Sequence, residues 1–215
     1  MFSEILSNYV EQYLPKLYRT EYNFLPAKSA DFEHKELKTY TDQSLLSHIL
    51  NGLYGITRLI EYLQQQDAIK LSKEDYKKLV VAYTLHDLHK LPEVETPDKE
   101  EFNIPLGVYE KKIKDLELDK FVEGNPKLCR AVSIHINTYS KKGTADFSSV
   151  DTLLLKLGRL ADAFASSDSI EKMESNQKLL KKIVGINLAT KISFEYHKLE
   201  DYRGLSTNLI HQVTS

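Results

Sequence analysis

Residues 83–92 read Tyr-Thr-Leu-His-Asp-Leu-His-Lys-Leu-Pro, and this stretch closes an apolar segment with two adjacent side chains that can bind a metal. Upstream, Ser72 with Asp75 three residues later is typical of a helix N-cap, and Pro92 favours a helix end. Between them, apolar residues recur at helical spacing: Leu79, Val80, Tyr83 and Leu88. The pattern therefore predicts a helix over 73–91 that carries His86 and Asp87 near its end.

Successive side chains on an α-helix diverge by about 100°. His86 and Asp87 can therefore reach one ion only if the ion lies beside the helix, near its terminus. The alternative interpretation is a surface helix with scattered polar residues, because a His-Asp pair also occurs by chance. Further ligand candidates elsewhere in the chain favour the metal site.

His48 is such a candidate, and it lies in a long segment of apolar residues at helical spacing: Leu45, Leu46, Ile49, Leu53, Ile56, Ile60 and Leu63. Gly52 and Gly55 interrupt this segment. A glycine inside a helix costs up to about 1 kcal/mol relative to alanine. We therefore expect these two glycines to serve close packing or access near His48.

Asp162 and His135 lie in two other apolar segments. Asp162 stands among Leu160, Ala161, Ala163 and Phe164. A carboxylate buried there without a cation would be costly, so a bound ion would explain it. His135 lies within the apolar run 128–137, and its alternative interpretation is a hydrogen-bonded histidine of the core.

The order His48, His86-Asp87, His135, Asp162 resembles the signature of the HD superfamily of metal-dependent phosphohydrolases. Residues 85–90 are similar to that family's His-Asp-x-x-Lys form, and 158–162 are similar to its closing segment. Segments 42–53 and 203–211 are similar to the N-terminal HD nuclease domain of the large subunit of type I-D CRISPR effector complexes. The resemblance covers nearly the whole chain. It implies an all-α helical bundle and metal-dependent hydrolysis of phosphoester bonds.

The ligand types indicate which metal to expect. Imidazole suits Mn, Fe, Co, Ni and Zn, whereas carboxylates suit harder ions and can bridge two of them, so a divalent transition metal is favoured over magnesium alone. We assign His48, His86, Asp87 and Asp162 to a first ion. Asp87 would bridge to a second ion bound by His135, with His89 as a helper. Two ions about 3.5–4 Å apart would promote in-line attack on phosphorus.

Lys90 completes the expected catalytic set with Asp87 and His89. Near the metal, the Lys90 ammonium would neutralise charge that develops on the phosphoryl oxygens. The alternative is that Lys90 is a cation that satisfies the C-terminus of its helix.

Composition predicts a single globular domain, because 215 residues with 41% hydrophobic content can bury one core and no composition shift divides them. We expect residues 1–215 to be one HD nuclease domain, with residues 199–215 continuing into a next domain. No sustained period-two alternation predicts a strand. The expected helices span 2–18, 42–66, 73–91, 105–119, 126–140, 150–167 and 176–200, with long polar connections at 19–40 and 92–104.

Other features bound the setting of the protein. No segment approaches the roughly 20 apolar residues of a membrane span, and the single Cys129, in an apolar run, predicts a buried thiol in a reducing cytoplasm. The net charge of −2 argues against a strong nucleic-acid groove. Lysine clusters lie at 111–114, 141–142 and 178–182. Each cluster would contact phosphates, and the alternative interpretation is that each is a solvated face.

Three functions follow as expectations. The first, which the resemblance implies, is a metal-dependent nuclease that cuts DNA, most readily single-stranded DNA, in type I-D CRISPR interference, an antiviral defence. Its partners would be DNA and the other subunits of the effector complex. The second is a phosphohydrolase of nucleotides or cyclic dinucleotides. The third is an interaction module whose site is catalytically vestigial.

Overall fold

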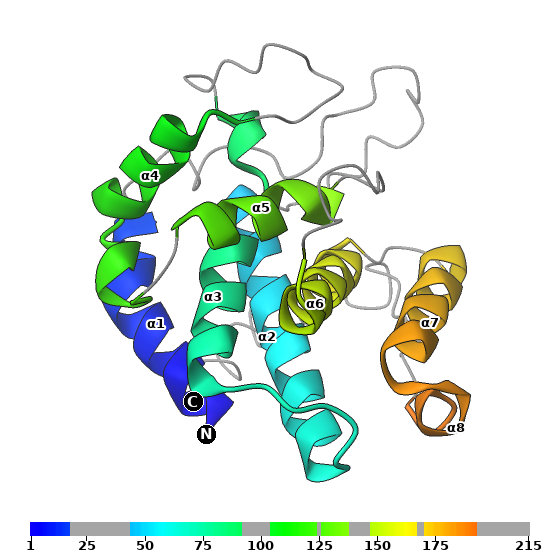
Figure 1. Ribbon diagram of the computed structural model, residues 1–215. Helices are drawn as coiled ribbons and strands as arrows, with labels where there is room; N and C mark the ends of the chain where they lie inside the picture. Colours follow the sequence, from blue (N-terminus) through cyan, green and yellow to red (C-terminus); the bar gives the residue numbers. More distant parts are fainter. Residues whose placement is uncertain (18–43, 92–103, 124–125, 138–146, 167–169, 193–215) are drawn as a thin grey trace, which may run out of the picture. The chain divides into compact units, whose positions relative to one another are not determined.

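The computed structural model describes residues 1–17, 44–91, 104–123, 126–137, 147–166 and 170–192, and these residues form helices and no strand (Figure 1). The expected all-α fold is therefore confirmed for this part of the chain. The chain divides into two compact units, Met1–Ala165 and Ser166–Ser215. The assignment of residues 1–215 to one nuclease domain stays a prediction.

The first unit is a bundle in which α2 packs most extensively against α6 (Figure 1). Helix α5 also contacts α6, α3 contacts both of these helices, and α1 lies along α2. The helices of this unit span α1 Phe2–Leu17, α2 Leu45–Gln65, α3 Lys73–Thr84, α4 Leu106–Asp115, α5 Pro126–Asn137 and α6 Ser149–Ala165, with short 3-10 turns η2 Leu88–Lys90 and η3 Leu118–Lys120.

Helix α2 buries the face that its apolar spacing predicts. Its N-cap is Ser44, whose hydroxyl accepts a hydrogen bond from the backbone N–H of Ser47 at 3.2 Å. The seven apolar residues of the predicted face are buried, and Leu59 is buried as well: Leu45, Leu46, Ile49, Leu53, Ile56, Leu59, Ile60 and Leu63. A β-carbon at Gly52 would lie 2.0 Å from the hydroxyl oxygen of Tyr83. The predicted close packing at this glycine is thus confirmed.

Helix α3 runs through the core. It begins at the predicted N-cap, where the Ser72 hydroxyl accepts a hydrogen bond from the backbone N–H of Asp75 at 3.0 Å. Every residue from Leu79 to Thr84 is buried. On its flank, the Ser133 hydroxyl of α5 donates a 2.6 Å hydrogen bond to the carbonyl of Ala82. The C-terminal end of α3 therefore lies inside the protein rather than at its surface.

The second unit contains α7 Ile170–Val184 and α8 Ile186–Ala189. The predicted helix 176–200 is wrong here, because Gly185 adopts a left-handed backbone with φ 81° and separates the two helices. The other predicted helices except 73–91 are present over the described residues, but 105–119 divides into α4 and η3 at Glu117, whose φ is 55°. Residues 18, 42–43, 138–140, 167 and 193–200 of the predicted spans lie outside the described residues. The connections 19–40 and 92–104, save Ile104, and the tail 199–215 lie outside the described residues. No described helix is both long and apolar enough to cross a membrane.

Candidate metal centre

The chain leaves helical geometry just before the His-Asp pair. Helix α3 ends at Thr84, residues 85–87 form a turn, and the 3-10 turn η2 follows. The backbone N–H of His86 bonds the carbonyl of Tyr83 at 3.2 Å, which tightens the chain. The predicted continuous helix 73–91 is therefore wrong. Adjacent side chains diverge on a helix, but in this turn the side chains of His86 and Asp87 can face the same point.

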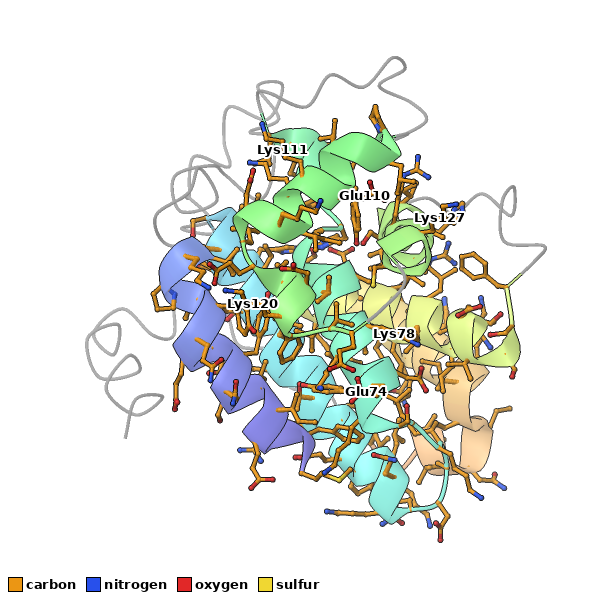
Figure 2. All side chains as sticks on the ribbon, turned by 60° about the vertical axis from the view of Figure 1, so that its left-hand side comes forward. Glu74, Lys78, Glu110, Lys111, Lys120 and Lys127 are labelled. Carbon is orange, nitrogen blue, oxygen red and sulfur yellow. The ribbon has the colours of Figure 1, made fainter. Side chains whose placement is uncertain are left out.

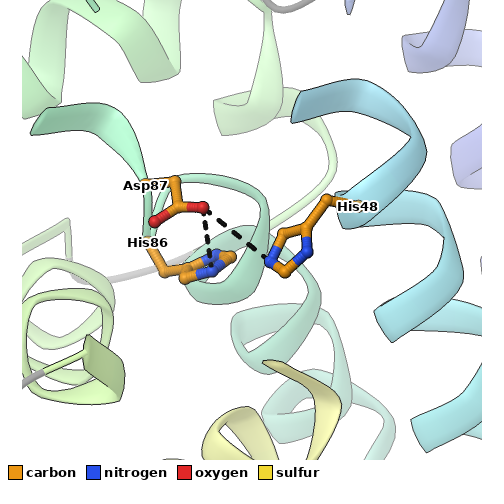
Figure 3. A group of neighbouring side chains, drawn as sticks. All are labelled: His48, His86 and Asp87. Carbon is orange, nitrogen blue, oxygen red and sulfur yellow. Dashed lines mark ion pairs between the residues drawn. The ribbon is translucent and has the colours of Figure 1, made fainter. Parts of the chain in front are cut away.

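A buried group of three side chains forms at this point (Figure 3). His48 from α2, His86 and Asp87 each offer a ligand atom, and these atoms lie within 4.8 Å of one another. Oδ2 of Asp87 is 3.4 Å from Nε2 of His86 and 3.8 Å from Nε2 of His48. Each residue is at most 3% exposed. Two imidazoles and a carboxylate, shielded from water, could hold a metal ion.

Asp162 reaches the same group from α6. Its Oδ1 lies 3.1 Å from Nε2 of His48 and 3.6 Å from Nε2 of His86. The Asp162 side chain is 32% exposed, in contrast to the buried three. The apolar neighbours of Asp162 in the sequence indicated deeper burial than the structure shows. Asp162 therefore marks the side of the group that water and small solutes can reach.

A main-chain hydrogen bond orients His86. Its Nδ1 donates to the carbonyl oxygen of Tyr83 at 2.5 Å. Because a carbonyl only accepts, the proton must be on Nδ1, and in the neutral ring Nε2 then carries the lone pair on the side of Asp87 and Asp162. This arrangement of a ring held through one nitrogen is typical of metal-binding histidines.

The charges in the group compensate one another. Burial by itself would lower the pKa of His86, but Asp87 and Asp162 outweigh it and raise that pKa above its ordinary value. Burial likewise acts to raise the pKa of each carboxyl, yet the histidines lower both, and Lys90 contributes for Asp87. Both acids are therefore anionic at neutral pH, which is the form that binds a cation.

Lys90 forms an ion pair with one of the candidate ligands. Its Nζ lies 2.6 Å from Oδ2 of Asp87, and its side chain is 28% exposed. The pairing follows from the 3-10 turn, which places residues 87 and 90 one above the other. The sequence identified Lys90 as a phosphate contact or a helix-end cation, and its contact with a candidate ligand was not foreseen.

The two remaining candidates lie outside the group. Among the described residues, the cluster that could hold a metal comprises only His48, His86 and Asp87. His89 follows in η2, and burial lowers its pKa. His135 is half-buried on α5 with its ring edge-on to Phe147, the centroids 5.8 Å apart. Its role as ligand to a second ion stays a prediction.

Comparison with known proteins finds no similar protein. No family model matches the chain, and no curated protein and no solved structure shows significant similarity to it. The described residues form an all-helical domain with a buried His/His/Asp cluster. The function of the protein is therefore inferred from the residues and geometry of this cluster.

Proposed function

We propose that the protein is a metal-dependent phosphodiesterase of the HD type that cuts DNA, single-stranded DNA most readily. The observation that carries this proposal is the buried group of His48, His86 and Asp87, which Asp162 approaches from a third helix. Its order in the chain is the order of the HD signature. Its donors are the mixture of imidazole and carboxylate that suits Mn, Co, Ni, Fe or Zn.

Each residue has a distinct task in this proposal. His48, His86, Asp87 and Asp162 would hold one divalent ion, which when bound would supply Lewis-acid activation of phosphorus and water. Burial of the first three excludes competing water from the ligands. Asp162 and Lys90 are partly exposed, which supports the proposal that a phosphate approaches the ion past these two side chains. The Lys90 ammonium would then pair with a phosphoryl oxygen.

The surface charge supports a weak rather than a tight hold on DNA. Figure 2 labels Lys111, Lys120 and Lys127 on one side of the first unit, together with Glu110 and Glu74. Some lysines of this side are paired with acids: Lys120 Nζ lies 3.2 Å from Glu117, and Lys78 Nζ lies 3.3 Å from Asp75. Basic side chains here alternate with acidic ones. We therefore propose that other subunits of a CRISPR effector complex supply part of the DNA-binding charge.

Lysines 141–142 lie outside the described residues, and Lys178, Lys181 and Lys182 belong to α7 of the second unit. Neither cluster adds to the first unit's surface as described. That these lysines contact phosphates stays a prediction, and so does the alternative that they form a solvated face.

A panel of substrates and metals tests the function. The purified chain is incubated with labelled single-stranded DNA, duplex DNA, RNA and a set of nucleotides and cyclic dinucleotides, each with Mn, Co, Ni, Mg or EDTA. We expect cleavage of single-stranded DNA with a transition metal and none in EDTA. Hydrolysis of nucleotides alone would replace the nuclease with a small-molecule phosphohydrolase. Metal binding without hydrolysis of any substrate would support a vestigial interaction module.

A further inference from the structure

Tyr83 contacts the candidate metal centre from within the core. Its ring stacks on the imidazole of His86, with centroids 4.4 Å apart and an angle of 13° between the planes. The side chain is fully buried. Tyr83 lies one helical turn before His86, so the end of α3 supplies both the ring and the carbonyl that holds Nδ1 of His86.

The ring and the carbonyl constrain different motions of the imidazole. A single hydrogen bond at Nδ1 fixes the tautomer, but it leaves the ring free to tilt about the N–H···O line. A parallel aromatic face at van der Waals distance opposes that tilt. Because the carbonyl belongs to the main chain, a substitution of Tyr83 keeps the acceptor of this hydrogen bond and changes only the side chain.

Tyr83 also touches the helix that carries His48. The hydroxyl of Tyr83 donates to the carbonyl of His48 at 3.5 Å, and the two rings are tilted by 33° with centroids 6.3 Å apart. Gly52 lies one turn further along α2. A β-carbon there would lie 2.0 Å from the Tyr83 hydroxyl oxygen and 2.4 Å from Cζ, so the phenol fits only against a glycine.

We propose that Tyr83 is a positioning residue that sets the orientation of His86 and its spacing from His48, and that Gly52 provides the room for it. This inference rests on the proposed metal centre. The phenol fills the space between the backbone of α2 and the imidazole of His86. Loss of the ring would leave the ligands present but poorly aligned, and supporting groups of this kind typically change metal affinity by about 10- to 100-fold.

Binding of Co²⁺ tests the inference, measured by calorimetric titration and by the visible absorption spectrum, which reports coordination geometry. We expect Tyr83→Leu to bind Co²⁺ about 10- to 100-fold more weakly with an altered spectrum. Tyr83→Phe keeps the ring and should bind Co²⁺ about as tightly as wild type, with the same spectrum. Tyr76→Leu is the matched control, because Tyr76 is equally buried on α3 and bonds Thr57 of α2 at 2.6 Å, two turns from the site.

Gly52→Ala gives a second, independent test that keeps every ligand and Tyr83. The added methyl group must displace either the ring or the backbone of α2, so we expect weaker Co²⁺ binding and a changed spectrum. Gly107→Ala on α4 is its control, because no atom lies within 4 Å of the added carbon. Gly52→Ala and Gly107→Ala together test the positioning role of Tyr83 even if Tyr83→Leu is not recovered folded.

The outcomes separate the two proposals. If wild-type protein binds no Co²⁺, the metal centre fails and the role of Tyr83 fails with it. If wild type binds Co²⁺ and either Tyr83→Leu or Gly52→Ala binds it with unchanged affinity and spectrum, only the role of Tyr83 is overturned. Equal loss of Co²⁺ affinity in Tyr76→Leu and Tyr83→Leu would likewise reduce Tyr83 to a core side chain.

Discussion

Nε2 of His48 and Oδ1 of Asp162 lie 3.1 Å apart, although 114 residues separate them in the chain. They meet because α2 packs along α6, the most extensive helix contact of the first unit. An imidazole and a carboxylate are thus held together at the edge of an apolar core. Such a polar contact is costly to bury unless charge and hydrogen bonds compensate it.

Removal of a ligand should abolish metal binding and hydrolysis together. We expect His86→Ala and Asp87→Ala to lose detectable DNA cleavage and tightly bound metal, because each removes a donor from a buried three-residue group. The helical content by circular dichroism should stay close to wild type. In EDTA, Asp87→Ala should also lower the unfolding free energy, since it removes the 2.6 Å ion pair with Lys90. Wild-type activity in either variant would refute the site.

The stability of the protein in EDTA should depend on pH in a defined way. The raised pKa of His86 gives stability that is present below its ordinary value of 6.5 and is lost as pH rises through the folded value. The lowered pKa values of Asp87 and Asp162 give stability that is present above 3.8 and is lost as pH falls through the folded values. Stability from this group is therefore greatest between these limits.

Urea unfolding in EDTA measures this effect, with a higher midpoint expected at about pH 5.5 than at about pH 8.5. His86→Gln is the control and should remove the difference. Saturating Co²⁺ should reverse the trend, because a metal binds only the neutral imidazole. A midpoint in EDTA that rises with pH in wild type and His86→Gln alike would contradict the prediction.

Lys90→Gln should separate metal binding from turnover. The Lys90 ammonium competes with any cation for Oδ2 of Asp87, at a distance of 2.6 Å. A charge-assisted hydrogen bond contributes about 1.5–3 kcal/mol, so its loss should tighten metal binding by about tenfold or more. DNA cleavage should nevertheless slow if Lys90 also pairs with the phosphate. Lys77→Gln is the control, because Lys77 pairs with Glu74 on the same helix. Weaker metal binding in Lys90→Gln would contradict the competition of Lys90 with the metal for Asp87.

The variants His135→Ala and His48→Ala should differ in metal content and activity. If His135 serves a second ion, His135→Ala keeps one tightly bound metal by elemental analysis and loses much of its activity. His48→Ala should lose the tight metal itself, because His48 belongs to the buried group. Full activity of His135→Ala with every metal would return His135 to the role of a core histidine.

Salt should weaken DNA cleavage more steeply than hydrolysis of a small chromogenic phosphodiester by the same site. Each neutralised phosphate of a single strand contributes roughly −0.7 to the slope of log affinity against log salt. The measurement compares both activities from about 20 to 300 mM salt at constant metal. A parallel decline of the two activities would place the salt effect on the metal site rather than on a strand-binding surface.

The sequence predicted the elements that depend on local pattern. The Ser72 cap, the buried face of α2 and the close packing at Gly52 all follow from spacing and residue type, and the structure confirms them. The buried thiol of Cys129 is confirmed as well. The grouping of His48 with His86 and Asp87 was predictable only through their order along the chain.

Other features depend on tertiary packing and could not be predicted. Apolar spacing continues through Leu88 and the first strong helix stop is Pro92, so nothing local indicates that α3 ends at Thr84. The stacking of Tyr83 on His86 has the same origin, because the residue reads as one more apolar position of the helix. The partial exposure of Asp162 likewise depends on what packs around α6, not on its sequence neighbours.

The ligand candidates come from α2, from the turn after α3 and from α6, so no two neighbouring segments of the chain can form the site by themselves. An ion held there would also cross-link three helices of the core. Its binding energy would then add to the free energy of folding, by about 2.7 kcal/mol at a metal concentration 100 times the dissociation constant. Bound metal would therefore stabilise the fold reversibly. The midpoint of thermal unfolding would then measure metal occupancy without any substrate.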